Sequence, residues 1–175
     1  MEQVILVNEQ DVELGVMEKM EAHEKALLHR AFSVFIFNDQ QELLLQQRAF
    51  SKYHSGGLWT NTCCSHPRPG ETVHDAAMRR LQEEMGFQTN LTKAFSFTYK
   101  APFSNGLTEH EFDHVFVGVY NNSIQPNPAE VESYAYYSFE QVENTLLQRP
   151  DDFTIWFQIA FPKVKEWYEQ QNNIV

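Results

Sequence analysis

The sequence is poor in cysteine and in basic residues, and it has no long apolar run. Its only cysteines, Cys63 and Cys64, are adjacent, so they offer no ordinary disulfide framework and favour a reducing compartment. The 13 Lys and Arg against 24 Asp and Glu give a formal net charge of −11, which disfavours a surface that binds nucleic acid or an anionic membrane. No stretch approaches the roughly 20 apolar residues of a membrane span, and the start lacks the signals of a secretory leader. We expect a cytoplasmic protein without nucleic-acid or membrane partners.

The 175 residues have the composition of a globular protein. Hydrophobic residues make up 42% of the chain, enough to build a core without disulfides. We find no internal repeat, low-complexity tract or long linker that would divide the chain. The length therefore predicts one domain over residues 1–175.

Apolar patterning predicts a mixed sheet with helices packed on it. Short apolar or alternating runs predict strands at 4–7, 31–37, 42–47, 94–101, 112–120 and 133–139. A helical stripe begins after Thr72, a favourable N-cap, and stops at Gly86. A second helical spacing runs from Phe153 to Tyr168. These elements together favour an α+β fold.

Three motifs carry a resemblance to a known family. They are TNTCCSHP around Cys64, the helix ending RRLQEEMG, and the pair Glu109 and Glu111; HEKALLHRAFSVFIF and LLLQQR extend the agreement over most of the chain. With these segments the sequence resembles the type 1 isopentenyl-diphosphate isomerases, a Nudix-related family. The resemblance implies a Nudix-like mixed β-sheet with flanking helices in α/β/α layers. It also implies an enzyme that interconverts isopentenyl and dimethylallyl diphosphate.

The Nudix box can be laid on this sequence with two departures. The box is Gly, five residues, Glu, seven residues, then Arg-Glu-apolar-x-Glu-Glu-x-Gly-apolar. Its conserved positions fall, in order, on Ser65, Glu71, Arg79, Arg80, Glu83 and Glu84. Ser65 replaces a Gly and Arg80 replaces a Glu. Arg80 removes one carboxylate from the metal cluster of a diphosphate hydrolase and places a cation beside Glu84 one helical turn on, which counts against hydrolysis.

The resemblance implies a divalent-metal site with five imidazole and carboxylate donors. The matching residues are His23, His29, His66, Glu109 and Glu111. In a strand, residues 109 and 111 project from one face, so both carboxylates reach one ion while His110 points away. Such a donor set suits Mn²⁺, Mg²⁺ or Zn²⁺, and the sequence leaves the choice open.

A structural zinc finger is the alternative for Cys63, Cys64 and His66. It fails on spacing, because adjacent cysteines in an extended segment point to opposite faces and no second cysteine pair completes four ligands. We therefore expect Cys63 to be a small buried apolar residue and Cys64 to face the site.

Moving the double bond requires one proton added at the terminal carbon and another removed from the allylic carbon. The resemblance assigns these transfers to Cys64 and Glu111, with the hydroxyl of Tyr99 assisting, and leaves open which group acts as acid and which as base. It also places Trp156 where an aromatic face stabilises a carbocation. Trp59 is a second candidate for the wall of the pocket.

The diphosphate end of a substrate needs positive charge. Residues 43–82 hold five basic and two acidic residues, a local surplus of three in an acidic chain. The resemblance assigns diphosphate contacts to Lys19, Arg48, Lys52, Ser65 and Arg80, and a phosphate-bridging Mg²⁺ to Glu84. We expect His54 and His74 to be solvated residues without a role.

Three functions remain in competition. The isomerase is favoured; the others are a Nudix diphosphohydrolase acting on a nucleotide or prenyl diphosphate and an inactive Nudix-like binding module. The last does not explain why Cys64, Tyr99 and Glu111 occur together with the metal donors. The only partner we expect is a small prenyl diphosphate, taken up by a monomer or a weak dimer.

Overall fold

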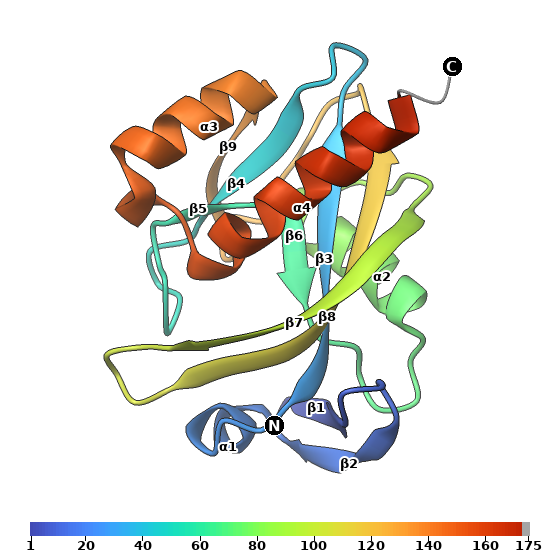
Figure 1. The fold of residues 1–175 in the computed structure, drawn as a ribbon, viewed down its shortest axis with the longest axis vertical. Coiled ribbons are helices and arrows are strands. Elements are labelled where there is room, and N and C mark those ends of the chain that lie inside the picture. Colours follow the sequence, from blue (N-terminus) through green and yellow to red (C-terminus); the bar gives the residue numbers. More distant parts are fainter. Residues whose placement is uncertain (173–175) are drawn as a thin grey trace.

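A computed structural model describes residues 1–172 of the chain (Figure 1). The strands are β1 (Gln3–Val7), β2 (Glu13–Glu18), β3 (His29–Phe37), β4 (Leu43–Arg48), β5 (Trp59–Thr60), β6 (Cys63–Ser65), β7 (Thr92–Pro102), β8 (Thr108–Val119) and β9 (Val131–Tyr137). The helices are α1 (Lys19–Glu24), α2 (Val73–Met85), α3 (Phe139–Gln148), the 3-10 helix η1 (Pro150–Asp152) and α4 (Ile155–Asn172). Within this part of the chain no helix is both long and apolar enough to cross a membrane.

Strand β3 is the centre of a mixed sheet. It runs parallel to β8 along its whole length and antiparallel to the short β6, and it meets β1 and β4 at its two ends. β4 continues the sheet to β5 and β9, and β7 pairs with the outer edge of β8. Both parallel and antiparallel pairs are therefore present, as the sequence predicts.

Alternation along β3 creates two cores. Phe32, Val34 and Ile36 face α2, and Phe35 and Phe37 face α3 and α4. All five side chains are buried, because successive residues of a strand point to opposite faces and both faces of this strand are covered. Figure 1 shows α3 and α4 in front of the sheet and α2 behind it. The α/β/α layering is confirmed.

Helix α2 begins and ends where its sequence predicts. The Thr72 side chain accepts a hydrogen bond from the backbone N–H of Asp75, and Gly86 ends the helix with a left-handed φ of 76°. Ala77, Leu81 and Met85 of its apolar stripe are fully buried. The capped ends and the buried stripe hold α2 in place, and with it the side chains of Arg80 and Glu84.

Several short helices and strands are not predicted by the sequence patterns. β5 and β6 span two and three residues, too few to show an alternation, and the amphipathic signal of α1 is limited to six residues. The strand expected at 133–139 ends at Tyr137, because Ser138 caps α3 in a reciprocal hydrogen-bonded capping box with Gln141. These short elements matter, because β6 and α1 carry residues of the site.

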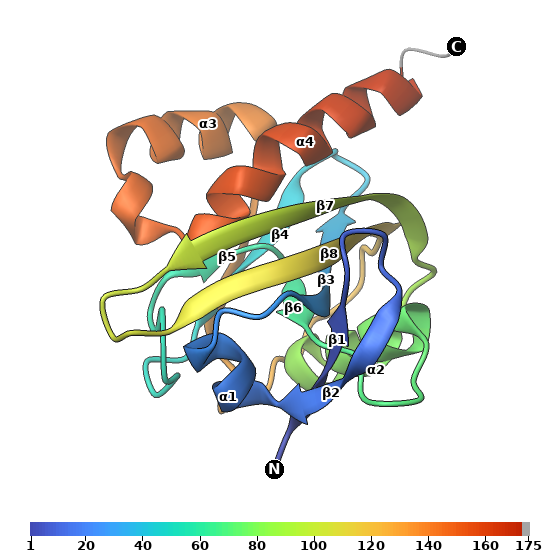
Figure 2. The same cartoon turned by 60° about the horizontal axis from the view of Figure 1, so that its bottom comes forward.

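The β7–β8 hairpin extends past the end of the sheet core. Figure 2 shows this hairpin beside α1, with the β1–β2 hairpin toward the viewer. Helix α1 contacts β8 directly. The N-terminal segment therefore lies against the extended end of β8.

We predict that Gly86→Ala lowers the free energy of unfolding by about 2–4 kcal/mol. A Cβ at Gly86 would lie 2.1 Å from the backbone oxygen of Gln125, in addition to the strain of its positive φ. Urea unfolding followed by circular dichroism measures the effect. Gly70→Ala is the matched control: it has a φ of 80° but nothing within 4 Å of its Cβ, so we expect a loss of only about 1 kcal/mol. Equal losses for the two variants would contradict the clash.

Candidate active site

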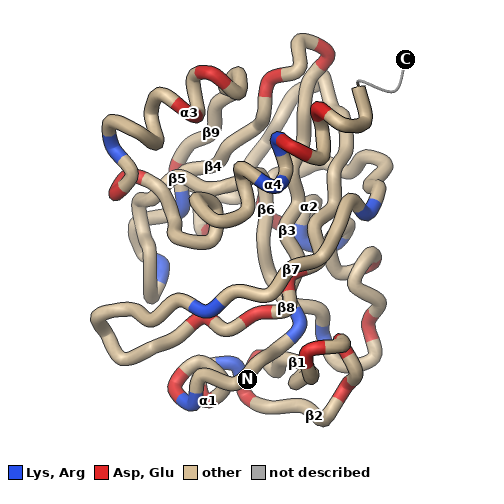
Figure 3. The backbone as a smooth tube through the Cα atoms, in the orientation of Figure 1, with Lys and Arg blue, Asp and Glu red and all other residues tan. Residues whose placement is uncertain are grey.

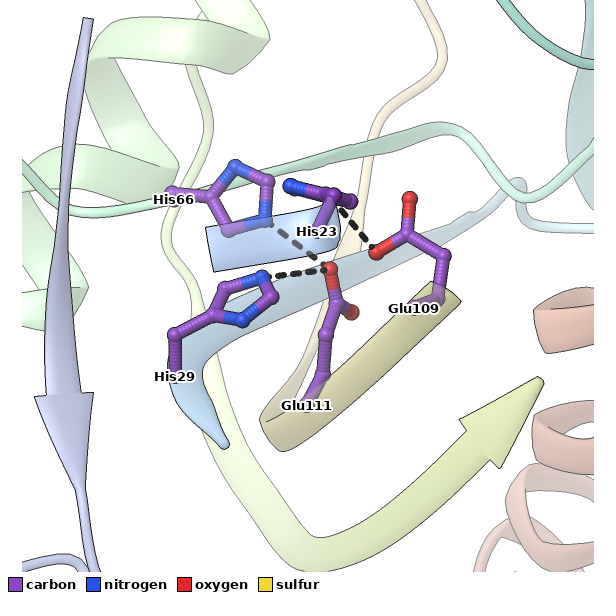
Figure 4. Close-up of side chains that lie close together, drawn as sticks. All are labelled: His23, His29, His66, Glu109 and Glu111. Atoms are coloured by element: carbon purple, nitrogen blue, oxygen red, sulfur yellow. Dashed lines mark hydrogen bonds and ion pairs between the residues drawn. The ribbon is translucent and has the colours of Figure 1, made fainter. Parts of the chain in front are cut away.

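A cavity of about 600 Å³, including the solvent at its mouth, opens between the end of the sheet, the start of α4 and the loop at residues 49–58. Most predicted site residues line it: Lys19, Arg48, Lys52, Cys64, Ser65, His66, Arg80, Glu84, Tyr99, Glu109, Glu111 and Trp156. The predicted metal residues His23 and His29 lie behind this lining and meet His66, Glu109 and Glu111 in one cluster (Figure 4). The structure thus gathers residues that are far apart in sequence.

The register of β3 and β8 brings the buried cluster together. His29 opens β3 directly opposite Glu111 of β8, and Glu109 lies two residues earlier on the same face. His66 follows β6, and His23 enters from α1. One ligand atom from each of the five residues lies within 4.8 Å of every other, and all five residues are buried. His110 points away from the cluster, with its Nδ1 2.9 Å from the carbonyl of Ala26.

The histidines present their Nε2 atoms to the centre of the cluster. The Nδ1 atoms of His23 and His29 lie 2.6 and 2.9 Å from the carbonyls of Lys19 and Leu27, so Nδ1–H donates there and each Nε2 faces the carboxylates, where it would bind a metal. The Nε2 atom of His23 lies 3.0 Å from Glu109 Oε2. The His29 Nε2 atom is buried and makes no hydrogen bond, and it lies 3.7 Å from Glu111 Oε1. A buried imidazole nitrogen that faces carboxylates without a hydrogen bond fits a divalent metal ion.

The charge state of the cluster also suits a cation. Burial acts to raise the pKa of Glu111, but His29 and the Tyr99 hydroxyl outweigh it and the pKa falls to about 2. Burial and the charge of Glu111 act to raise the pKa of Glu109, and His23 and His54 outweigh both and lower it. Burial lowers the pKa of His66 well below its usual range, and the nearby cationic groups add to this effect. The ionised carboxylates of Glu109 and Glu111 thus face the neutral imidazole of His66.

Cys64 and Glu111 reach the same cavity from strands on opposite sides of β3. Cys64 on β6 pairs with Ser33, and Glu111 on β8 pairs with His29. The adjacent Cys63 turns to the other face, where it is fully buried in the α2 core, as the sequence predicts. Tyr99 on β7 lies opposite Glu111, and its hydroxyl donates a 2.8 Å hydrogen bond to Glu111 Oε2.

Burial sets the protonation of the thiol and the phenol. It raises the pKa of Cys64 well above its usual range, although the Arg48 guanidinium opposes the shift. It also raises the pKa of Tyr99, with the charge of Glu111 adding to the effect. At neutral pH the cavity therefore holds a protonated thiol and a protonated phenol beside an ionised Glu111.

Trp156 forms an aromatic wall of the cavity and Trp59 does not. Trp156 is 4% exposed and packs with Tyr99 and Cys64. The Arg48 guanidinium carbon lies 5.2 Å from the centre of its ring, a cation–π contact. The expectation for Trp59 is wrong: it packs on Tyr137 and lines a separate small pocket with Phe153, because β5 turns it to the α4 side.

Of the four Lys and Arg residues that line the cavity, all but Arg48 pair with carboxylates. Lys19 lies 3.1 Å from Glu2, Lys52 pairs with Glu130, and Arg80 pairs with Glu84, Glu83 and Glu130. Glu84 also accepts a 2.8 Å hydrogen bond from Gln46. These basic residues therefore form a self-neutralised patch, whereas many acidic residues lie outside it, including those along α3 (Figure 3).

Sequence reasoning missed four residues that line the cavity: Gln46, Tyr53, His54 and Glu130. The expectation that His54 is solvated is wrong, because its loop folds inward and leaves it 8% exposed. No local pattern marks these residues, since their neighbours in the cavity come from distant segments. His74 is exposed, as expected.

We predict that Mn²⁺ raises the melting temperature of chelator-treated protein through this cluster. An ion at a hundred times its dissociation constant stabilises the fold by about 2.7 kcal/mol. His29→Ala removes a donor and should reduce the shift, whereas exposed His74→Ala should retain it. Thermal unfolding with and without Mn²⁺ measures both. An unchanged melting temperature of the unmodified chain with Mn²⁺, Mg²⁺ and Zn²⁺ would count against the site.

Known proteins with similar sequences belong to the family that the site residues indicate. A family model described as NUDIX domain matches residues 27–157. The isopentenyl-diphosphate Delta-isomerase of Pectobacterium atrosepticum is 53% identical over 95% of this chain and 93% of its own. The protein of the same name from Serratia proteamaculans is 51% identical over 89% of this chain and 87% of its own.

Solved structures agree on the fold. A Deinococcus radiodurans protein has a TM-score of 0.70 at 21% identity, over 85% of this chain and 90% of its own. A MutT protein from Methanosarcina mazei has a TM-score of 0.65 at 17% identity, over 82% of this chain and 95% of its own. The sequence relatives, which match nearly the whole chain at about half identity, define the family more narrowly than the fold does. The chain belongs to the isopentenyl-diphosphate Delta-isomerase family of NUDIX-domain proteins.

Proposed function

We propose that this protein interconverts isopentenyl diphosphate and dimethylallyl diphosphate by adding a proton at one carbon and removing one from another. The family relationship supports this activity. The observation that carries it is a single cavity lined by a thiol, a phenol and Glu111, with Glu111 also part of the buried His/Glu cluster. These groups can transfer protons to and from a carbon atom beside a metal site.

We assign the two proton transfers to Cys64 and Glu111. They begin in opposite protonation states, because burial keeps the thiol protonated and His29 and Tyr99 keep the carboxylate ionised. Each turnover adds one proton to the substrate and removes another, so it requires one group that gives and one that takes. Tyr99 donates to Glu111 and steadies its charge. In the reverse reaction the group that took a proton returns it and the group that gave one takes it back, and exchange of protons with solvent restores the starting states after each turnover.

The metal ligands we propose are His23, His29, His66, Glu109 and Glu111. Their donor types suit Mn²⁺, Mg²⁺ or Zn²⁺. When bound, the ion supplies positive charge that fixes the position and ionisation of Glu111. The buried histidines and carboxylates also exclude water from the end of the cavity where the carbon chain reacts.

Trp156 is the proposed stabiliser of positive charge on the substrate carbon. A carbocation has no hydrogen-bond partner, and an aromatic face lowers its free energy by about 0.5–2 kcal/mol. The Arg48 guanidinium lies at cation–π distance from the Trp156 ring. Its ring is therefore accessible to positive charge from the cavity.

The proposed diphosphate contacts are Lys19, Arg48, Lys52, Ser65 and Arg80, and Glu84 would hold the Mg²⁺ that accompanies the diphosphate. All six residues line the cavity. Phosphate oxygens would replace Glu130 and Glu2 as partners of the lysines and Arg80. Arg80 also counts against a diphosphohydrolase, because it stands where the Nudix box has a Glu and so removes one carboxylate from the metal cluster that hydrolysis uses.

We predict deuterium in dimethylallyl diphosphate, and no released phosphate, when the protein turns over isopentenyl diphosphate with Mg²⁺ in D₂O. The acidic protons of Cys64 and the carboxyl group exchange with solvent, so the added hydrogen carries the label. Mass spectrometry and a phosphate assay measure the two outcomes. Released phosphate would instead indicate the hydrolase, and neither signal would indicate a binding module.

We predict that Cys64→Ala and Glu111→Gln each lower turnover by at least about a hundredfold, because each removes one proton-transfer group. Cys63→Ala is the matched control, since its side chain lies in the α2 core, and we expect it to remain active. Initial rates of dimethylallyl diphosphate formation and the melting temperature separate chemistry from folding. A folded Cys64→Ala variant with full activity would overturn the assignment.

A further inference from the structure

His54 contacts Glu109 on the side away from the histidine cluster. Its Nε2 atom lies 3.0 Å from Glu109 Oε1, while the other oxygen, Oε2, lies 3.0 Å from His23 Nε2. One carboxylate thus has each oxygen held by a different imidazole. The five-donor cluster of the described residues does not include His54. His54 therefore contacts a proposed ligand from outside the donor set.

Three aromatic side chains pack against the His54 ring. It stacks on Phe103 of the β7–β8 turn with centroids 5.1 Å apart, and it meets Trp156 edge-on at 5.8 Å. Tyr53 packs edge-on against it at 4.4 Å, and the Ser55 hydroxyl lies 3.3 Å from its Nδ1. A ring fixed in this way cannot turn without disturbing the wall formed by Trp156.

The loop that carries His54 is folded tightly. Ser55 adopts a left-handed φ of 53°, which is costly for a residue with a side chain. A Cβ at Gly56 would lie 2.7 Å from the carbonyl oxygen of Phe50, so the chain crosses itself closely here. The His54 carbonyl also accepts a 3.3 Å hydrogen bond from Arg48. This backbone directs the imidazole into the cavity.

We propose that His54 is a positioning residue that holds Glu109 Oε1 so that Oε2 faces the metal. The same imidazole packs against Trp156 and Phe103, so it links the metal site to the aromatic residues of the cavity. A carboxylate with one oxygen fixed presents only the other to an ion and loses less freedom on binding it. Partners of this kind change metal affinity by about 10–100-fold. The proposal rests on the metal site of the proposed function and adds a residue to its support.

The test compares His54→Phe with His54→Gln in the full-length protein. Phe keeps the aromatic packing but removes the donor, whereas Gln keeps an N–H donor near the position of Nε2. Isothermal titration of chelator-treated protein with Mn²⁺ measures affinity. We expect binding at least about tenfold weaker in His54→Phe and recovery of most of this loss in His54→Gln. His74→Phe, at an exposed position, is the matched control and should bind as the unmodified chain does.

Equal affinity in His54→Phe and the unmodified chain would overturn the proposal. So would an equal loss in His54→Phe and His54→Gln, because that result reflects packing rather than the contact with Glu109. If His54→Phe does not fold, His54→Ala removes the donor without added bulk and is judged by the same criteria. An unmodified chain that takes up no Mn²⁺ would overturn the metal site itself, which distinguishes that failure from a failure of His54 alone.

Discussion

The parallel register between β3 and β8 is the constraint on which the rest of the site depends. It sets His29 against Glu111, and through the β3–β6 pairing it sets Ser33 against Cys64. A slip of one residue would turn Glu109 and Glu111 to the opposite face of the sheet. The register is secured by the apolar residues farther along β3, which are buried on both faces. The positions of the site residues are thus fixed by the packing of apolar side chains elsewhere on β3.

Burial gives the cavity its chemical character. Removing water raises the pKa of the thiol and the phenol, while imidazoles and hydroxyls hold the carboxylates ionised in the same low-dielectric space. Such an arrangement is costly, because buried charges lose hydration. Two apolar cores, one on each face of the sheet, offset that cost. The buried polar groups whose desolvation is unfavourable are therefore gathered in the cavity where the reaction takes place.

The sequence predicts the regular parts of this protein well. Alternation along β3, the Thr72 cap and the Gly86 stop each follow from local rules, and the structure matches them. The resemblance locates the cluster at His23, His29, His66, Glu109 and Glu111 because the motif preserves residues whose spacing alone would not show their proximity. The sequence patterns give the wrong place for His54 and Trp59 and do not identify Glu130. Their positions depend on an irregular loop, a long-range ion pair and a two-residue strand, none of which leaves a periodic signal.

The carboxylates that pair with the cavity's cations have a consequence for selectivity. Glu130 contacts both Lys52 and Arg80, and Glu2 contacts Lys19, so the protein competes internally with any anion that approaches. A singly charged anion gains little by displacing a carboxylate of the same charge, whereas an anion with several negative charges and several oxygen atoms can pair with more than one of these cations. The ion pairs therefore favour a multiply charged anion over a singly charged one at the mouth of the cavity.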